Sequence, residues 1–383
     1  MLNAEIEPPQ RTIPGETRLL HARRIRRSPY TPLVERHGVT GWTVYNHMLL
    51  PVAIEGVAED YEHLRRAVQV WDVAAERQVE IAGPDATELM QLMTPRRMTD
   101  APTMRCLYAP ICDADGGMLN DPLVLRLESD RWWISVADSD VLLYAKGIAA
   151  GRGLHVAVRE PDVFPLAVQG PRADDLAARV FGEAVRDLRF FGAGRFDALG
   201  ARHVVTRSGW SGQGGFEVFV EGWERTAPMW EALMEAGRDL DVRPGCPNAI
   251  ERIESGLLSF GNDMTLRDDP YQCGLGRYVD PDAPCLAREA LRARAEPTRG
   301  LRGLRLEGGA MPVLAARWPL ESEDGEPVGH VTSAALSPRL GAIGIGMLDR
   351  RAWEPGTRVR ASLPDGTTRA GRVATLPLKD ADA

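Results

Sequence analysis

Cysteine is scarce in this chain, and the cysteines present lack the spacing of a metal site. Only five occur in 383 residues, with no CxxC pair and no histidine cluster beside them. Because zinc and iron–sulfur centres need such clusters, no metal site is expected. The odd number and the lack of a secretory apolar segment at the start indicate free thiols in a reducing compartment, which predicts a cytoplasmic protein. The cysteines are Cys106, Cys112, Cys246, Cys273 and Cys285.

Positive charge and long apolar runs are lacking as well. The chain has 46 Lys and Arg against 54 Asp and Glu, a net charge of -8. Since nucleic-acid binders carry a basic surface, nucleic acid is not expected as a partner. No apolar run approaches the roughly 20 residues that span a bilayer, so no membrane is expected either. With 44% hydrophobic and 26% charged residues, the length suits two or three domains with buried cores.

Several familiar catalytic motifs are also missing. There is no GxxxxGK[ST] loop for nucleotide phosphates and no GxSxG nucleophile elbow. The glycines of residues 341–346 do not open a strand–helix unit of the dinucleotide-binding kind. The histidines are scattered, so none of them alone indicates a general base.

One local unit, a strand followed by a Gly-Pro turn and a helix, occurs twice. Residues 78–81 alternate like a strand and lead through a turn into a helix at 86–93. The segments AGPDATELM and QGPRADDLA therefore indicate an internal duplication and two related α+β lobes. The last part, 301–383, reads as short strands separated by Gly and Pro turns, which suits a small β-barrel. Other expected elements are strands at 108–112, 118–127 and 131–136 and helices at 59–70, 139–150, 224–238 and 248–259.

Carboxylates beside glycine turns are the most informative polar residues. Asp121 follows GGMLN in an otherwise apolar strand, and Glu217 follows a similar turn in GGFEVFV. A carboxylate there is costly unless a partner or ligand meets it. Arg252 and Glu254 are two residues apart on one expected helix, so they need not pair with each other. Each of these could simply be capped or salt-bridged. Together they suggest a pocket for a polar heterocycle with a carboxylate tail, which Arg252 would hold.

Four longer motifs connect these residues to a family. GGMLNDPLVL, LAVQGPRA, RSGWSGQGGFEVFV and RIESGLLSFGND stand in an order and spacing that resemble the aminomethyltransferase superfamily. That superfamily includes the folate-dependent T-protein of the glycine cleavage system. Within it, the segments VYNHMLLP, VWDVAAERQVEI, RWWISVADSD and PGCPNAIERIESGLLSFGNDM look most like the dimethylsulfoniopropionate demethylases.

The resemblance implies an α+β fold, a three-lobed aminomethyltransferase-like ring of two related α+β lobes plus a C-terminal β-barrel. Folate would lie in a central channel. The first α+β lobe, with folate-binding residues, is expected at 1–57 and 155–280. The second, carrying Asp121, is expected at 58–154, and the barrel lobe at 281–383.

Site residues follow from the same resemblance. Asp121 matches the family's functional aspartate beside the reactive pterin nitrogen and is the expected catalytic residue. Glu217 matches the glutamate that hydrogen-bonds the pterin, and Arg252 matches the arginine near the glutamyl end of folate. Tyr108 matches a tyrosine that lines the channel. Tetrahydrofolate is thus implied as the methyl acceptor.

The departures from the T-protein pattern concern the donor. Trp210 stands where the glycine-cleavage enzymes have Tyr, and Gln213 and Gly214 replace an acidic pair. These changes argue against an aminomethyl group on a lipoyl carrier. A sulfonium is a cation without N–H donors, and aromatic faces bind such cations with ~0.5–2 kcal/mol per contact. Several aromatic rings around such a cation would form an aromatic cage. The candidates for this cage are Trp42, Tyr45 and Trp210.

The function expected from this resemblance is a tetrahydrofolate-dependent methyltransferase. It would move a methyl group from dimethylsulfoniopropionate to tetrahydrofolate and release methylmercaptopropionate and 5-methyltetrahydrofolate. A demethylase of the same fold acting on a betaine, an N-methyl amino acid or an aryl methyl ether stays open. So do a glycine cleavage aminomethyltransferase and a folate-binding module without transfer activity. The expected partner is a small-molecule methyl donor, and a homodimer stays open.

Overall fold

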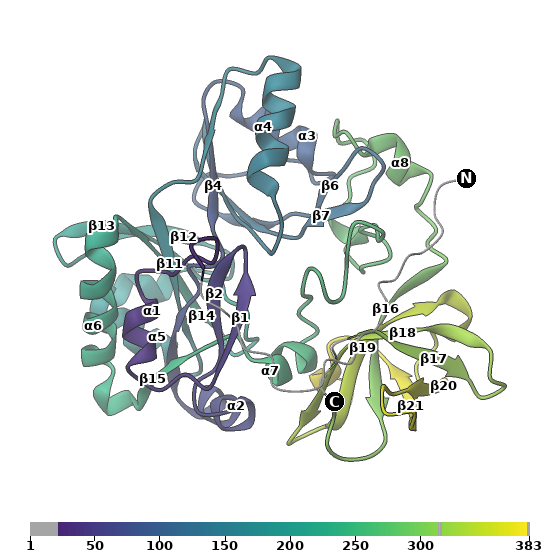
Figure 1. Ribbon diagram of the computed structural model, residues 1–383. Coiled ribbons are helices and arrows are strands. Elements are labelled where there is room, and N and C mark those ends of the chain that lie inside the picture. Colours follow the sequence, from purple (N-terminus) through teal and green to yellow (C-terminus); the bar gives the residue numbers. More distant parts are fainter. Residues whose placement is uncertain (1–21, 313, 315, 381–383) are drawn as a thin grey trace.

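The computed structural model describes residues 22–380 except 313 and 315, and it consists of three lobes around a common centre (Figure 1). Two lobes are α+β and the third is a closed barrel, so the expected fold class is confirmed. Within the part that the structure describes, no helix is long and apolar enough to cross a bilayer.

The first lobe is built on a six-stranded sheet whose central strands are buried on both faces. The central strands β11 and β14 are almost wholly buried, which explains their near-continuous apolar sequences. The helices α1 (Thr31–Glu35), α5 (Ala173–Phe181) and α6 (Thr226–Ala236) cover one face (Figure 1). The sheet order is β12 (Ala193–Ala198), β13 (Ala201–Thr206), β14 (Gly215–Glu221), β11 (Val163–Gln169), β3 (Val68–Asp72) and β15 (Val242–Gly245).

The second lobe has a five-stranded antiparallel sheet. The helices α3 (Ala86–Met93) and α4 (Val141–Arg152) pack against it. On the other face, Trp133 packs against Phe219 of the first lobe, with ring centroids 5.7 Å apart. The two sheets therefore share an apolar interface. The strand order is β10 (Ala157–Arg159), β4 (Gln78–Ala82), β9 (Arg131–Ser135), β8 (Leu123–Glu128) and β5 (Cys106–Tyr108), and β6 (Ile111–Cys112) pairs with β7 (Met118–Asn120).

The repeated strand–turn–helix unit occurs once in each α+β lobe. Gly83 follows β4 and Gly170 follows β11, and their φ angles are +136° and +121°. A Cβ at Gly83 would lie 2.5 Å from the carbonyl oxygen of His155, and one at Gly170 would lie 2.4 Å from that of Ala67. Both turns therefore need glycine for the same two reasons, close approach and a left-handed backbone. This geometry supports the internal duplication.

The third lobe is a six-stranded barrel with a continuous apolar interior. It closes because β16 pairs with both β19 and β21. Helix α8 (Arg288–Arg292) lies in the segment that leads into it. The barrel strands are β16 (Arg299–Leu306), β19 (Gly341–Asp349), β18 (Pro327–Ser337), β17 (Trp318–Ser322), β20 (Arg358–Ser362) and β21 (Thr368–Ala374).

Strand membership differs from the expected lobe boundaries at two places. Strand β3, inside the range 58–154 assigned to the second lobe, lies in the first-lobe sheet between β11 and β15. Strand β10, inside 155–280, pairs with β4 of the second lobe. Periodicity identifies a strand but not its partner, so the sequence does not show these two crossings between the lobes. Residues 1–21 of the expected first lobe lie outside the described part of the chain.

The remaining elements are a β-hairpin, two helices and short 3₁₀ turns. The hairpin of β1 (Gly41–Tyr45) and β2 (Met48–Ala53) turns through Asn46 and His47, both with positive φ. Helix α2 (Val57–Arg66) precedes β3, and α7 (Ala249–Glu254) lies between the first lobe and the barrel (Figure 1). Short 3₁₀ turns are η1 (Glu183–Asp187), η2 (Trp223–Arg225), η3 (Arg238–Leu240), η4 (Gly276–Tyr278), η5 (Arg350–Ala352) and η6 (Leu378–Asp380).

Candidate functional site

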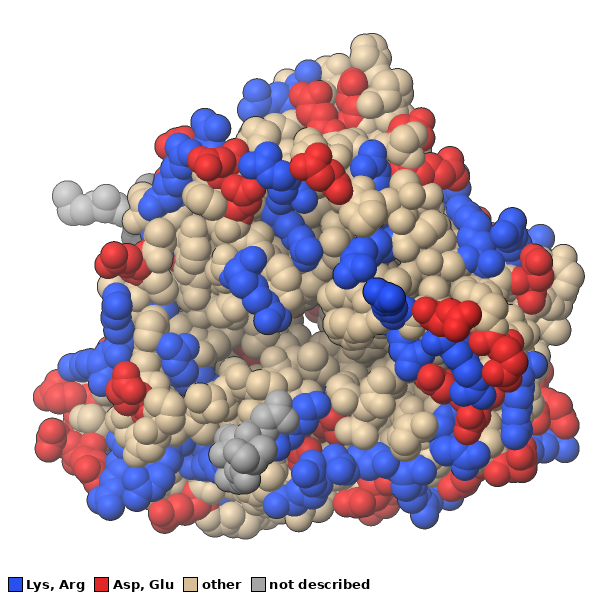
Figure 2. All heavy atoms as spheres, turned by 180° about the vertical axis from the view of Figure 1, so that it is seen from behind, with Lys and Arg blue, Asp and Glu red and all other residues tan. Residues whose placement is uncertain are grey.

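A cavity of about 1970 Å³ lies where the three lobes meet. Its wall includes Asp121 of the second lobe, Glu217 of the first and Ala335 of the barrel. From behind, the surface is hollowed at the centre between the lobes (Figure 2). Small-molecule pockets usually measure ~300–1,000 Å³, so this cavity has room for more than one small molecule.

Asp121 enters the cavity because its strand is interrupted. Pro122 has no backbone N–H, and the long strand expected over 118–127 is divided into β7 and β8 around it. The Asp121 carboxylate accepts a hydrogen bond from the Tyr108 hydroxyl at 2.7 Å. Burial raises the pKa of Asp121 to about 7, although the Tyr108 hydrogen bond acts in the opposite direction. The residue can therefore change charge near neutral pH.

Glu217 reaches the same cavity from the first lobe. It lies on the buried strand β14, and its carboxylate accepts a hydrogen bond from Ser208. Burial raises the pKa of Glu217, and the Ser208 hydrogen bond opposes this shift. Two carboxylates from different sheets thus face one space, as the sequence led us to expect.

Of the three aromatic residues expected to form a cage, two line the cavity. Tyr45 ends β1 and Trp210 lies in the loop between β13 and β14. Trp42 is not among the lining residues. The place of Trp42 in the cage stays a prediction.

Arg252 lines the cavity, but its guanidinium already donates three hydrogen bonds to other residues of the chain. Its Nη1 donates to Asp263 at 2.8 Å and to the Leu257 carbonyl at 3.2 Å, and its Nη2 donates to Ser333 on the barrel. The guanidinium also lies 5.8 Å from the centroid of the Trp210 ring. Arg252 consequently joins α7 to the barrel and has fewer donors for a ligand tail than the sequence suggested.

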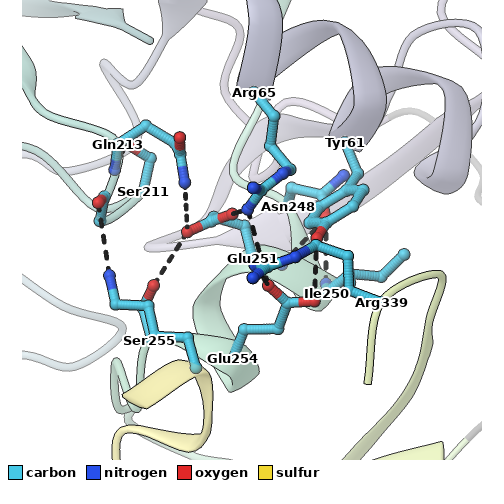
Figure 3. Close-up of polar contacts among 12 residues, drawn as sticks. Tyr61, Arg65, Ser211, Gln213, Asn248, Ile250, Glu251, Glu254, Ser255 and Arg339 are labelled. Atoms are coloured by element: carbon cyan, nitrogen blue, oxygen red, sulfur yellow. Dashed lines mark hydrogen bonds and ion pairs between the residues drawn. The ribbon is translucent and has the colours of Figure 1, made fainter. Parts of the chain in front are cut away.

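A buried network around α7 fixes the loop that carries Trp210 (Figure 3). Gln213 of this loop donates to Glu251 at 3.1 Å, and Ser255 donates to the same oxygen at 2.9 Å. Tyr61 of α2 and Arg339 of the barrel bind Glu254 at 2.9 and 3.3 Å. The network connects the cavity wall to α2 and to the barrel. Arg252 and Glu254 do not pair with each other, as expected from their spacing.

Sequence reasoning missed several residues of the cavity wall. Glu76 lies in the turn after β3, and its only sequence signal is a charge within the apolar run VWDVAAE. Tyr278 packs edge-on against Tyr108, with ring centroids 5.4 Å apart. Arg277 and Arg302 also line the cavity, and neither has an ion-pair partner among the described residues. Glu76, the neighbouring Arg277 and Tyr278, and Arg302 are far apart in sequence, so only the tertiary fold brings these three places together.

The arrangement suits binding and alignment more than metal chemistry. Within residues 22–380, with 313 and 315 left out, no group of His, Cys, Asp and Glu has the arrangement to hold a metal ion. The wall offers carboxylates, a phenol, an indole and guanidinium groups. Such a wall can bind a polar heterocycle and a cationic ligand side by side.

Two known protein-family domains match the sequence of this chain. The GCVT N-terminal domain matches residues 33–283, and the glycine cleavage T-protein C-terminal barrel domain matches residues 299–380. The chain belongs to the aminomethyltransferase superfamily.

Individual relatives in this superfamily match over nearly full length. Dimethylsulfoniopropionate demethylase DmdA of Ruegeria pomeroyi is 53% identical over 348 residues, covering 90% of this chain and 95% of that protein. An aminomethyltransferase of Saccharopolyspora erythraea is 30% identical over 361 residues, covering 91% and 97%. The crystal structure of the glycine cleavage aminomethyltransferase T of Bartonella henselae superposes with a TM-score of 0.83 at 22% identity, covering 93% of this chain and 99% of that one. The last match shows the shared fold.

Proposed function

We propose that the chain is a tetrahydrofolate-dependent methyltransferase that demethylates dimethylsulfoniopropionate. The products are methylmercaptopropionate and 5-methyltetrahydrofolate. The observation that carries the proposal is that Asp121 and Glu217, from different sheets, face one central cavity in a chain 53% identical to a dimethylsulfoniopropionate demethylase.

The residues of the cavity fit a reduced folate. Glu217 is a buried hydrogen-bond acceptor for the amino-pyrimidine edge, and Tyr108 and Asp121 lie on the facing lobe. Nη1 of Arg252 donates to two acceptors in the chain and Nη2 donates to Ser333, so Nε and the second Nη2 hydrogen are the donors for the glutamyl end. When bound, tetrahydrofolate would supply the nitrogen that gains the methyl group and releases its proton to solvent, while the sulfur leaves as a neutral thioether.

The protein contributes alignment and charge. A methyl group on a sulfonium is already activated, so the chain needs no nucleophile of its own. Holding two reactants in line contributes up to ~7–11 kcal/mol in favourable systems. The Asp121 carboxylate, held by Tyr108, orients the acceptor and places negative charge beside the cation. Tyr45 and Trp210 provide aromatic faces for the sulfonium.

A direct assay tests this proposal. The purified protein is incubated with tetrahydrofolate and dimethylsulfoniopropionate, and both products are quantified by mass spectrometry. Equal amounts of 5-methyltetrahydrofolate and methylmercaptopropionate are expected, and Asp121→Ala should lose more single-turnover rate than Gln213→Ala. Normal turnover by Asp121→Ala would show that the role given to this carboxylate is wrong.

Glycine betaine and dimethylglycine serve as parallel donors. Product from either of them, with none from dimethylsulfoniopropionate, would favour a demethylase of another methylated donor. Folate binding with no product from any donor would favour a binding module. The cytoplasmic location and the homodimer stay predictions.

A further inference from the structure

Glu76 is a third carboxylate in the cavity wall, and the mechanism above does not use it. It lies partly buried in the turn after β3, on the same cavity as Asp121 and Glu217. Asp121 has Tyr108 as a hydrogen-bond donor and Glu217 has Ser208. The Glu76 carboxylate has no hydrogen-bond or ion-pair partner in the part of the chain that the structure describes. Its place in the wall therefore calls for a partner from outside the chain.

The turn that carries Glu76 is fixed to the hairpin that carries Tyr45. Asn46 directly follows Tyr45, and its buried Nδ2 donates to the Ala75 carbonyl at 3.0 Å and to the Val136 carbonyl at 2.9 Å. Ala75 directly precedes Glu76. These hydrogen bonds hold the aromatic ring and the carboxylate as neighbours on one side of the cavity.

The electrostatic surroundings of Glu76 are unfavourable for its charge. Burial raises the pKa of Glu76 well above its usual range, and Glu217 and Asp121 raise it further. Burial, followed by the charge of Glu76, likewise raises the pKa of the Tyr45 hydroxyl. Among the residues that the structure describes, no basic side chain lowers the pKa of Glu76 again. A partly buried carboxylate beside two others costs stability unless a cation approaches it.

We propose that Glu76 binds the positively charged head of the methyl donor, with the Tyr45 ring against the same head. A carboxylate and an aromatic face recognise a sulfonium or quaternary ammonium without needing N–H donors. The inference rests on the proposed function for the identity of the donor. By itself, the inference specifies only that the head of the donor is an onium group with a positive charge.

Carbon isosteres separate charge from shape. In 4-methylpentanoate, a neutral carbon replaces the sulfonium of dimethylsulfoniopropionate, and 3,3-dimethylbutanoate matches glycine betaine in the same way. Calorimetry without folate, so that no turnover occurs, gives the affinity for each member of a pair. The wild type should prefer the onium member of its donor pair by about tenfold to a hundredfold. Glu76→Gln should lose most of that preference and bind the neutral member as tightly as the wild type.

Two control variants make the result specific. Glu354 also lines the cavity but is exposed, so Glu354→Gln removes the same charge there and should keep the wild-type preference. Glu76→Asp keeps the charge at a greater distance and should have an intermediate preference. If Glu76→Gln does not fold, an unchanged preference in Glu76→Asp contradicts the inference.

The inference and the proposed function can fail separately. Full wild-type preference in Glu76→Gln, or no preference for either onium in the wild type, overturns the role of Glu76. Tight, Glu76-dependent binding of dimethylsulfoniopropionate without any methylated folate supports the role of Glu76 and contradicts the proposed reaction.

Discussion

At the scale of single residues, the sequence was most informative where a charge interrupts an apolar strand. Asp121 and Glu217 both stand next to glycine turns in apolar surroundings, and both face the cavity. Glu76 escaped notice because it lies in a turn, where a charged residue is ordinary. Trp42 is not among the residues that line the cavity, and its contact with a ligand stays a prediction.

The raised pKa of Asp121 gives a pH prediction. With a pKa of about 7, this carboxyl group is mostly protonated and uncharged below neutrality. Because the cation needs the charged form, kcat/KM for the donor should rise with pH and level off above about 7. Tyr108→Phe removes the hydrogen bond that lowers the pKa, so the rise should move to higher pH. Stopped assays across pH 5–9 measure both profiles, and an unchanged midpoint in Tyr108→Phe would contradict this account.

At the scale of elements, helix and strand type were readable, while the ends of elements were less so. The helix expected at 86–93 matches α3 residue for residue. The helix expected at 248–259 ends at Glu254, because Gly256 has a φ of +65° and the Leu257 N–H bonds back to the Arg252 carbonyl at 2.8 Å, a glycine C-cap. A glycine after a helix is a stop signal, so the apolar periodicity alone carried the expected helix too far.

The contact between the Trp210 loop and α7 can be tested by a charge exchange. Glu251 is only 1% exposed and accepts a hydrogen bond from Gln213. Gln213→Glu replaces that donor by a second carboxylate, so it should lower the free energy of unfolding by about 1–3 kcal/mol. Glu251→Gln in the same chain should restore much of the loss, since the pair again has a donor and an acceptor. Urea unfolding at pH 8 of both single variants and the double variant measures the coupling, and strictly additive effects would contradict a direct contact.

At the scale of the whole molecule, the duplication and the barrel were visible in the sequence, but the partners of each strand were not. Strand β3 was expected in the second lobe and lies in the first-lobe sheet, and β10 was expected in the first lobe and lies in the second-lobe sheet. The chain therefore crosses between the lobes more often than its motifs reveal. Each of the three lobes supplies part of the cavity wall. One site made from three lobes explains why no compact motif in the sequence marks it.

Transfer of a labelled methyl group tests the central claim most directly, because that claim is that both reactants meet in this one cavity. The protein, in excess over deuteromethyl-labelled dimethylsulfoniopropionate, is mixed with tetrahydrofolate and quenched over a single turnover. The expected result is that the intact labelled methyl group appears on folate at the rate at which methylmercaptopropionate forms, and that Asp121→Ala slows both together. Thioether release without label on folate, or equal rates for Asp121→Ala and the wild type, would contradict the account.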